Sequence, residues 1–459
     1  MHRIATKPGD LDFERELKAV TQTPADILLV SSADTELAGI AQVWGPRFKG
    51  NLRLMQANHL QHPNAAEHYA DNVLCKSRLA IFRLHGGYGY FSHLLEEIKH
   101  IKSHGAKTRI LVLPGTDEWD QELLQFCDYS EPIVQQFFSY FREGGIENLQ
   151  KAADAVELLL ENKTEILPQS IQVPTYGWLN YDISKNQKLS KLDINKSKDG
   201  KNVNQSHSNS GIVWLTFYRA LQQTADMQVV EALIKALQNH GLKVSAFFAY
   251  SLREPEAQEE LIQKKEEDPP DAILTMQSFS IGRMDERVSF LETLNCPVIQ
   301  VATSSESLDE WMNNPRGLSP SNVAMSVALP ETDGRIFSTV VGFKQEQGVD
   351  SDLQFRTKYL VPEKIQISHV AELTANWVRL RKIENSKKRV AIILANYPNK
   401  DSRLGNGVGL DTPASVLLFL EELKKRGYLI ESKESSKKLP KNGDELIRLL
   451  QSGITNDEE

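Results

Sequence analysis

The stretch Arg389-Val-Ala-Ile-Ile-Leu-Ala-Asn-Tyr-Pro-Asn-Lys-Asp-Ser-Arg-Leu-Gly-Asn-Gly-Val-Gly-Leu-Asp-Thr-Pro-Ala-Ser415 decides the fold class. Its apolar run from Val390 to Ala395 predicts a buried strand. A polar loop with three glycines follows, and then a helix that Asp411 or Thr412 can cap, with Pro413 in its first turn. A strand, a polar loop and a helix in this order form the part of an open α/β sheet where ligands bind.

The three glycines, at positions 405, 407 and 409, match neither the dinucleotide fingerprint nor the Walker loop. A dinucleotide fingerprint has its third glycine one residue later, and a Walker loop has a lysine and a hydroxyl residue where this chain has Leu410 and Asp411. The loop nevertheless holds several polar side chains that can contact a ligand: Asn396, Asp401, Arg403, Asn406 and Asp411. From these residues alone, a ligand site and a solvated connection rich in turn formers are equally good interpretations.

The composition is that of a multidomain globular protein. The chain has 459 residues, of which 40% are hydrophobic and 25% charged, so we expect two to four domains. A formal net charge of -8 argues against nucleic-acid binding, because phosphates are neutralised by a basic excess. The sequence shows no signal peptide, no apolar run long enough to span a membrane and no closely spaced cysteine pair, so we expect a cytoplasmic protein.

The remaining chain alternates short apolar strands with amphipathic helices, which predicts an α/β fold with two or more doubly wound parallel sheets of the flavodoxin-like or Rossmann-like kind. Aromatic residues between Phe137 and Phe141 favour a core helix rather than a cofactor site. We expect an N-terminal α/β domain (1–117), a helical connector (118–183), a polar linker or insertion (184–210), a second α/β domain (211–316), a β-rich excursion with a return helix (317–386) and the start of a third α/β domain (387–459).

Histidines offer few candidates for metal binding. His59 and His62 have the spacing of a one-sided helical pair, but no glutamate or cysteine follows at a metal-site interval, so we expect no resident metal site. His85 follows a predicted strand and precedes two glycines, where either a structural hydrogen bond or a ligand contact would fit. The chain contains no nucleophile elbow, no HExxH and no Walker loop, so no catalytic residue is assigned.

The loop from Asn396 to Ser415 resembles the signature loop of the cobaltochelatase large-subunit (CobN) family, relatives of the magnesium chelatase H subunit. Further segments resemble this family in the expected order: Ser31-Ser-Ala-Asp-Thr-Glu-Leu, Arg83-Leu-His-Gly-Gly-Tyr, Leu113-Pro-Gly-Thr-Asp, Phe141-Arg-Glu-Gly-Gly-Ile-Glu-Asn, Phe217-Tyr-Arg and Ala324-Met-Ser-Val-Ala-Leu-Pro-Glu-Thr-Asp-Gly-Arg. The likeness covers the N-terminal third of the family's length, which implies that the catalytic region lies outside this chain.

The resemblance implies insertion of Co²⁺, as a substrate, into hydrogenobyrinic acid a,c-diamide during cobalamin biosynthesis. It also implies that AAA+ partner subunits bind ATP and Mg²⁺, that this chain binds the tetrapyrrole, and that the chain alone is inactive. His85, Tyr88, Asn396, Asp401, Arg403, Asn406 and Asp411 are the candidate ligand contacts. A stand-alone tetrapyrrole or metal carrier, a scaffold for the ATPases and a magnesium chelatase H-type subunit of chlorophyll biosynthesis are the alternatives.

Overall fold

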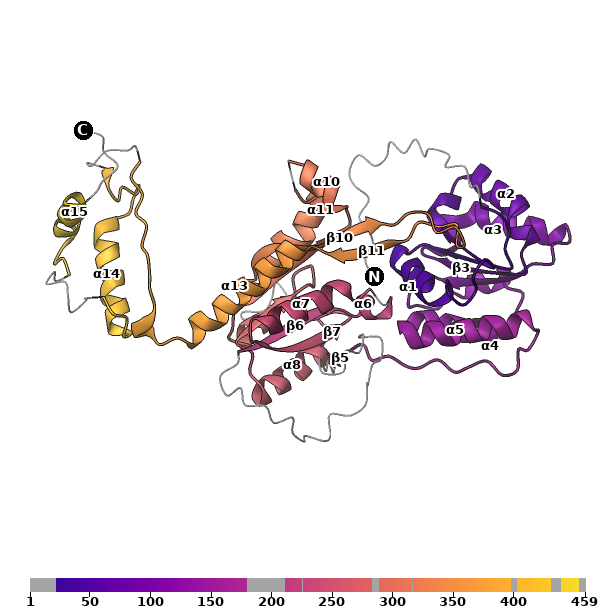
Figure 1. Cartoon of the computed structure of the whole chain (residues 1–459), viewed down its shortest axis with the longest axis horizontal. Coiled ribbons are helices and arrows are strands. Elements are labelled where there is room, and N and C mark those ends of the chain that lie inside the picture. Colours follow the sequence, from indigo (N-terminus) through magenta and orange to yellow (C-terminus); the bar gives the residue numbers. More distant parts are fainter. Residues whose placement is uncertain are drawn as a thin grey trace. The chain divides into compact units, whose positions relative to one another are not determined.

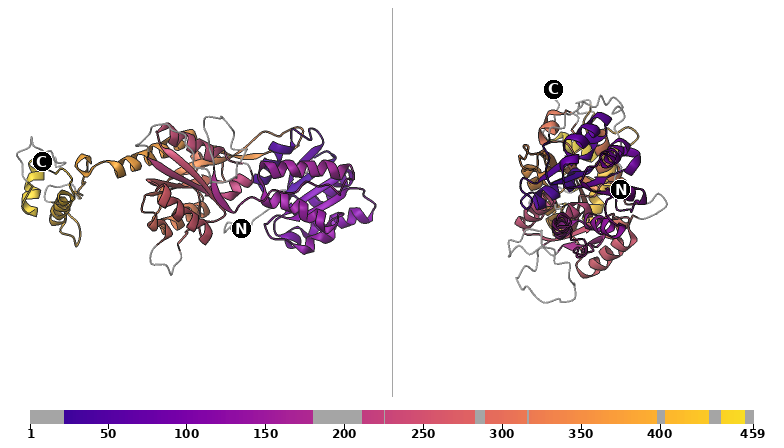
Figure 2. Two further views of the ribbon diagram at one scale, coloured as in Figure 1. Left: turned by 90° about the horizontal axis from the view of Figure 1, so that it is seen from below. Right: turned by 90° about the vertical axis from the view of Figure 1, so that its right-hand side faces the viewer.

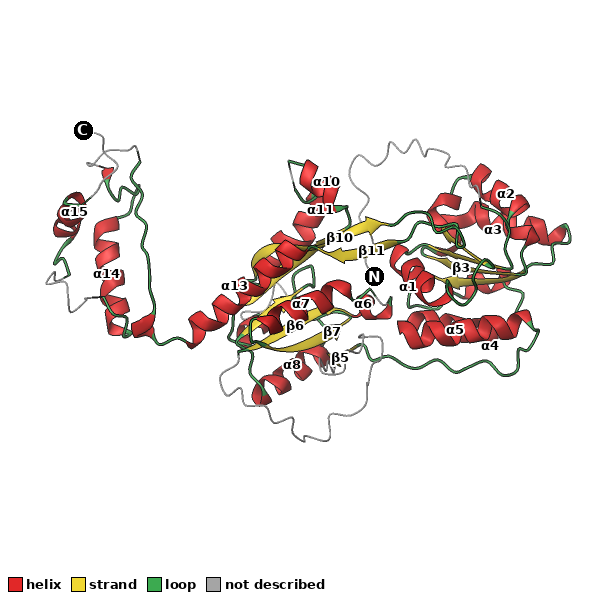
Figure 3. Cartoon of the chain, viewed as in Figure 1, coloured by secondary structure: helices red, strands yellow, loops and turns green. Residues whose placement is uncertain are grey.

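The computed structural model describes residues 22–179, 211–224, 226–282, 289–315, 317–397, 403–430 and 439–453. The chain divides into two compact units, one ending at Ala375 and one beginning at Asn376. The first unit contains two β-sheets with helices on their faces, so the predicted α/β class is confirmed (Figure 3). The predicted linker at 184–210 lies outside the described residues.

The first sheet has four parallel strands in the order β2-β1-β3-β4. These strands are β1 (Ile27–Ser31), β2 (Leu52–Gln56), β3 (Leu79–Leu84) and β4 (Arg109–Pro114). The chain places β2 on one side of β1 and then β3 on the other side. Because the strand order reverses between β1 and β3, their carboxyl ends form the crevice where ligands bind in such sheets.

Helices cover both faces of this sheet, as a parallel sheet requires (Figure 1). Leu29 and Ile81 pack on one face with α1 (Asp34–Trp44), α4 (Glu131–Glu143) and α5 (Gly145–Leu160). Leu28 and Phe82 pack on the other face with α2 (Pro63–Asn72) and α3 (Gly87–Ser103). Phe137, Phe138, Tyr140 and Phe141 are all buried in α4, which confirms that they belong to the core.

The second sheet has seven strands in the order β11-β10-β9-β8-β6-β7-β5, with antiparallel strands only at its two edges. They are β5 (Tyr176–Leu179), β6 (Ile212–Tyr218), β7 (Lys243–Ala249), β8 (Ala272–Thr275), β9 (Val298–Ser304), β10 (Ile336–Glu346) and β11 (Lys358–Pro362). Helices α8 (Pro255–Glu267) and α9 (Phe290–Thr293) pack on one face, and α7 (Gln228–Asn239) lies on the other. The strand order reverses again, this time between β6 and β8.

The two sheets form two lobes of the first unit (Figure 2). The loop between β10 and β11 crosses from the second lobe to the first, where Leu353 is 4% exposed within the first lobe's core. Its backbone is held there by Arg53, which donates to the Asp352 carbonyl at 2.7 Å, and by a hydrogen bond from Leu54 N to Leu353 O at 3.3 Å. The loop therefore fastens one lobe to the other.

Part of the predicted β-rich excursion, residues 323–329, where the sequence favours a strand, is helical instead. Pro320–Val323 forms α11, Ala324–Ala328 is a π-helical turn and Leu329–Glu331 is α12. Ser319 caps this run by accepting a hydrogen bond from Asn322 N at 3.3 Å. Alanine, methionine and leucine favour helix, and they outweigh the two valines on which the strand prediction rested.

The second unit contains α14 (Thr412–Lys425) and α15 (Gly443–Gln451), together with the end of α13 (Lys364–Lys382). The buried strand predicted at 390–395 is wrong for this structure, because among the described residues no strand pairs with this segment and Ile393 is 93% exposed. A strand needs a neighbour for its backbone groups, and the described part of this unit supplies only two isolated bridges, Asn396 with Leu404 and Gly407 with Leu410.

Candidate functional site

The carboxyl edge of the first sheet is built from three of the segments that carry the family resemblance. Ser31 and Ser32 follow β1, the His85-Gly-Gly turn follows β3, and the Gly115-Thr-Asp turn follows β4. His85 N donates to Ser32 Oγ at 3.1 Å, which joins the first two across the point where the strand order reverses. The N-cap of α1 is Ala33, which has no side-chain cap, and the neighbouring Ser32 hydroxyl donates to the Arg83 carbonyl at the sheet edge.

A buried ion pair between Arg83 and Glu36 stabilises this edge. Arg83 Nε lies 3.0 Å from Glu36 Oε1, and their side chains are 6% and 13% exposed. Ser31 donates to the same carboxylate, and Arg83 also donates to the Pro114 carbonyl. The pair thus connects the ends of β1, β3 and β4, which makes the edge rigid before any ligand binds. Sequence alone does not reveal this pair, because charged partners distant in the chain cannot be paired without the fold.

Of the predicted contacts on this edge, His85 is exposed and Tyr88 is half-buried. Tyr88 Oη donates to Glu96 Oε1 at 3.1 Å, and this hydrogen bond raises the pKa of Tyr88. The Tyr88 ring stacks on Phe126 with their centroids 6.1 Å apart. Tyr88 is therefore already held by the protein, whereas His85 stands at the surface of the edge with its backbone fixed.

A second cluster lies where the two lobes of the first unit meet. Glu143, at the end of α4, approaches Arg219, the first residue of α6 (Arg219–Gln223), with 3.4 Å between Oε2 and Nη2. Arg219 also donates to the carbonyls of Val173 and Pro174 at 2.9 Å each. Burial lowers the pKa of Arg219, and Glu143 opposes that shift. This cluster joins two of the segments on which the family resemblance was based, and its role is structural.

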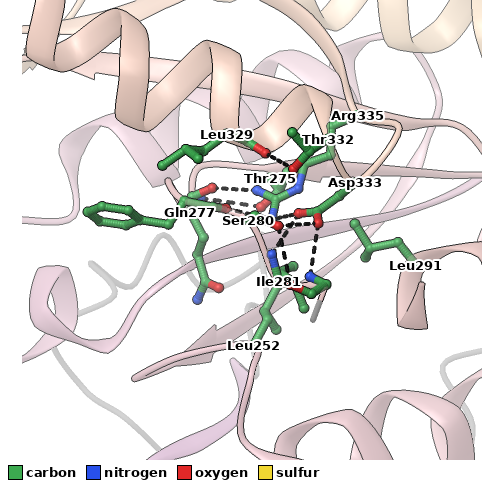
Figure 4. Close-up of polar contacts among 12 residues, drawn as sticks. Leu252, Thr275, Gln277, Ser280, Ile281, Leu291, Leu329, Thr332, Asp333 and Arg335 are labelled. Atoms are coloured by element: carbon green, nitrogen blue, oxygen red, sulfur yellow. Dashed lines mark hydrogen bonds and ion pairs between the residues drawn. The ribbon is translucent and has the colours of Figure 1, made fainter. Parts of the chain in front are cut away.

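The carboxyl edge of the second sheet is closed by Asp333 and Arg335 (Figure 4). Asp333 accepts hydrogen bonds from Ser280 Oγ at 2.6 Å, Ile281 N at 2.7 Å and Gly282 N at 2.9 Å. Arg335 Nη2 lies 2.7 Å from Asp333 Oδ2, with the two side chains 0% and 1% exposed. The Thr332-Asp-Gly-Arg turn therefore holds the loop that follows β8.

Backbone hydrogen bonds hold part of the polar loop of the second unit. Gly405 N donates to Ala395 O at 2.9 Å and Asn406 N donates to Arg403 O at 3.0 Å. Asp411 Oδ1 accepts from Ala414 N at 3.0 Å, so Asp411, one of the two predicted caps, is the cap of α14. The side chains of Arg403 and Asn406 are exposed and Asn396 is half-buried. Asp401 lies outside the described residues.

The predicted ligand contacts thus form two groups, one in each compact unit.

His62, one of the two histidines considered for metal binding, accepts a hydrogen bond from Asn64 N at 3.2 Å and so caps α2. In the described ranges, three or more metal-ligating side chains nowhere converge. None of the helices described is long and apolar enough to cross a membrane.

The fold and the site together define the class of this protein. It is an α/β protein with polar loops at the carboxyl edges of two sheets whose central strands are parallel. Residues 138–459 match the CobN/Magnesium Chelatase family, and the chain belongs to that family. It is 34% identical to an aerobic cobaltochelatase subunit CobN from a Sinorhizobium species, over 99% of this chain and 35% of the relative. The corresponding subunit of Pseudomonas aeruginosa is 30% identical, over 100% of this chain and 35% of the relative.

A solved structure supports the fold. The catalytic subunit of cobaltochelatase from Mycobacterium tuberculosis matches 94% of this chain and 33% of its own length, with a TM-score of 0.67 and 24% sequence identity. The chain therefore spans about a third of the length of the relatives that it matches.

Proposed function

We propose that this chain is the N-terminal part of an ATP-dependent cobaltochelatase large subunit that inserts Co²⁺ into hydrogenobyrinic acid a,c-diamide in cobalamin biosynthesis. The observation that carries the proposal is 34% identity to an aerobic CobN subunit along 99% of this chain. A magnesium chelatase H-type role is less well supported, because a rice ChlH subunit is 26% identical over only 52% of this chain.

In this proposal the chain binds the tetrapyrrole, and metallation requires further parts of the complex. Inserting a metal requires the ring-nitrogen protons to leave and a hydrated cation to lose water, tasks for carboxylates or imidazoles in a dry cavity. The two groups of candidate contacts are exposed or half-buried in the described structure, so they suit binding better than proton transfer. Co²⁺ is the substrate, and ATP with Mg²⁺ belongs to AAA+ partner subunits in the cytoplasm.

The exposed side chains suit a polar tetrapyrrole. The proposed ring carries carboxylate groups, and Arg403 presents an exposed guanidinium that can pair with them. Asn396, Asn406 and Asp401 would add hydrogen bonds to amide groups of the ring, with Asp411 fixing the loop to α14. His85 and Tyr88, on the first unit, are separate candidate contacts that would provide an imidazole and a ring face.

A reconstitution experiment separates this function from its alternatives. The chain is mixed with tetrapyrrole, Co²⁺, ATP and the AAA+ subunits, with and without a polypeptide equivalent to the remaining two thirds of a CobN subunit. Metallation only when that polypeptide is present supports the proposal. Tetrapyrrole binding that never leads to metallation indicates a carrier, and ATPase binding without tetrapyrrole affinity indicates a scaffold. Either of the last two results would overturn the proposal.

A further inference from the structure

Two histidines meet at the C-terminal end of α3, away from the sheet edge where His85 and Tyr88 lie (Figure 1). His100 lies in the last turn of the helix and His104 caps it. Their ring centroids are 4.3 Å apart with 43° between the ring planes, and both side chains are exposed. Two histidines four residues apart on one face of a helix have the spacing at which a pair of imidazoles binds one metal ion.

The backbone of α3 fixes the protonation of the His104 ring. Its Nδ1 lies 2.9 Å from the His100 carbonyl oxygen. A carbonyl oxygen can only accept, so Nδ1 carries a proton and the neutral ring has its lone pair on Nε2. Histidines that bind metal ions commonly donate their other N–H to a backbone carbonyl in this way, because the hydrogen bond fixes the tautomer and the orientation of the ring.

The separation of the two rings suits a shared ion. Two imidazoles at adjacent positions of an octahedral ion, with metal–nitrogen bonds of about 2.1 Å, have ring centroids roughly 4.5 Å apart. The observed 4.3 Å between His100 and His104 therefore requires only a small adjustment.

The charges of α3 permit a cation at this end of the helix. Lys99 Nζ lies 3.3 Å from Glu96 Oε1, and Lys102 Nζ lies 2.9 Å from Asp128 Oδ2. Each lysine of the helix thus has its own carboxylate partner. The free carbonyls at the C-terminus of a helix carry partial negative charge, which favours a bound cation. Glu97, one turn before the first histidine, adds a half-buried carboxylate.

We propose that His100 and His104 form a surface binding site for a divalent transition-metal ion, and that this site takes up Co²⁺ before insertion. Imidazole nitrogen suits ions such as Co²⁺, Ni²⁺ and Zn²⁺, whereas Mg²⁺ prefers oxygen ligands. With only two protein ligands the ion keeps bound water and can leave again, as a substrate must. The uptake of Co²⁺ rests on the proposed function, but the metal site itself does not.

Calorimetric titration of the full chain with CoCl₂ alone, without tetrapyrrole or ATP, tests the site. His100→Gln and His104→Gln each remove one imidazole and keep a polar side chain. His93→Gln is the matched control, since His93 is exposed in the same helix, two turns before His100. Melting temperatures in the absence of metal show whether each variant folds.

We expect the wild type and His93→Gln to bind Co²⁺ saturably with equal affinity. His100→Gln and His104→Gln should bind it at least about tenfold more weakly, because each loses one of the two protein ligands. Excess Ni²⁺ should displace the Co²⁺, and excess Mg²⁺ should not. Equal Co²⁺ affinity in all four proteins, no saturable binding by the wild type, or displacement by Mg²⁺ overturns the proposal.

The uptake of substrate Co²⁺ is tested in the reconstituted metallation reaction at limiting Co²⁺. His104→Gln should raise the KM for Co²⁺, and His93→Gln should not. A KM for Co²⁺ that is the same in the wild type and His104→Gln overturns the uptake role. Absence of metallation by the wild-type complex counts against the proposed function instead, and the calorimetric titration then decides the metal site on its own.

Discussion

Glu143 and Arg219 form an ion pair, 3.4 Å between Oε2 and Nη2, at the junction of the two lobes of the first unit, and their side chains are only 10% and 7% exposed. Val173 N donates to the same carboxylate oxygen at 3.0 Å, so Glu143 also holds the segment that leads into the second lobe. A charge buried this deeply is tolerated only while its partner is present. The pair therefore fixes how the lobes meet.

Replacing Glu143 with glutamine should destabilise the first unit by about 3 kcal/mol, because Arg219 would remain buried without a countercharge. Chemical unfolding monitored by circular dichroism measures the change. Glu147→Gln is the control, since Glu147 is exposed in the same helix region. A loss below about 0.5 kcal/mol in Glu143→Gln, the range of ordinary surface changes, would show that the pair does not hold the lobes together.

The Asp333 carboxylate should make stability sensitive to acid. Burial by itself would raise the pKa of Asp333, but hydrogen bonds from Ser280, Ile281 and Gly282 and the charge of Arg335 outweigh it and lower that pKa. The unfolded chain then binds a proton more tightly than the folded chain. The stabilisation is therefore complete above the unfolded pKa of ~3.9 and is lost as pH falls through the folded value.

Asp333→Asn should accordingly cost about 3 to 5 kcal/mol at pH 7, and the difference from wild type should shrink below about pH 4. Urea unfolding at several pH values provides the measurement, with the exposed Asp309→Asn as control. A difference between the two proteins that stays constant down to pH 2 would contradict this account of Asp333.

Asp226 should change the stability of the chain with pH in the opposite direction. It is 3% exposed, Leu360 N donates to its Oδ2 at 3.3 Å, and among the described residues its Oδ1 has no hydrogen-bond partner. Burial raises the pKa of Asp226, so the folded chain binds the proton more tightly. Stability is then greatest below the unfolded pKa of ~3.9 and falls as pH rises to the folded value.

Asp226→Asn should therefore stabilise the chain by about 1 kcal/mol at pH 7, because it removes a buried charge and keeps an acceptor for Leu360 N. The gain should disappear near pH 3. Thermal unfolding at both pH values tests this. A variant less stable than wild type at pH 7 would mean that the charged carboxylate is needed.

Gly115 should be indispensable at the carboxyl edge of the first sheet. A Cβ atom there would lie 2.6 Å from His85 N and 2.9 Å from the Leu84 carbonyl carbon, both backbone atoms. Gly115→Ala should lose about 1 to 3 kcal/mol, the range for overpacking, and shift the His85 turn. Gly89→Ala, where no atom lies within 4 Å, should be neutral or stabilising. Equal stabilities for the two variants would refute the close approach.

The sequence predicted the parallel sheets well because their strands are short, apolar and separated by clear helices. It also narrowed the cap of α14 to Asp411 or Thr412, of which the structure shows Asp411, since a local hydrogen bond can be predicted from spacing. It missed the Arg83–Glu36 and Glu143–Arg219 pairs, whose members are far apart in the chain. The strand prediction for residues 390–395 was wrong for another reason. An all-apolar segment is typical of a strand inside a sheet, but the described second unit offers it no neighbouring strand.

The most direct test of tetrapyrrole binding is an absorbance or fluorescence-quenching titration of the chain with hydrogenobyrinic acid a,c-diamide. Asp401→Ala/Arg403→Ala is the variant. Glu384→Ala/Lys387→Ala is its control, an ion pair with 3.0 Å between Lys387 Nζ and Glu384 Oε2 that lies outside the loop. We predict saturable binding by the wild type and the control, and at least a tenfold weaker affinity for the loop variant. No binding by a folded wild-type chain would contradict the proposal that this part of the subunit holds the tetrapyrrole.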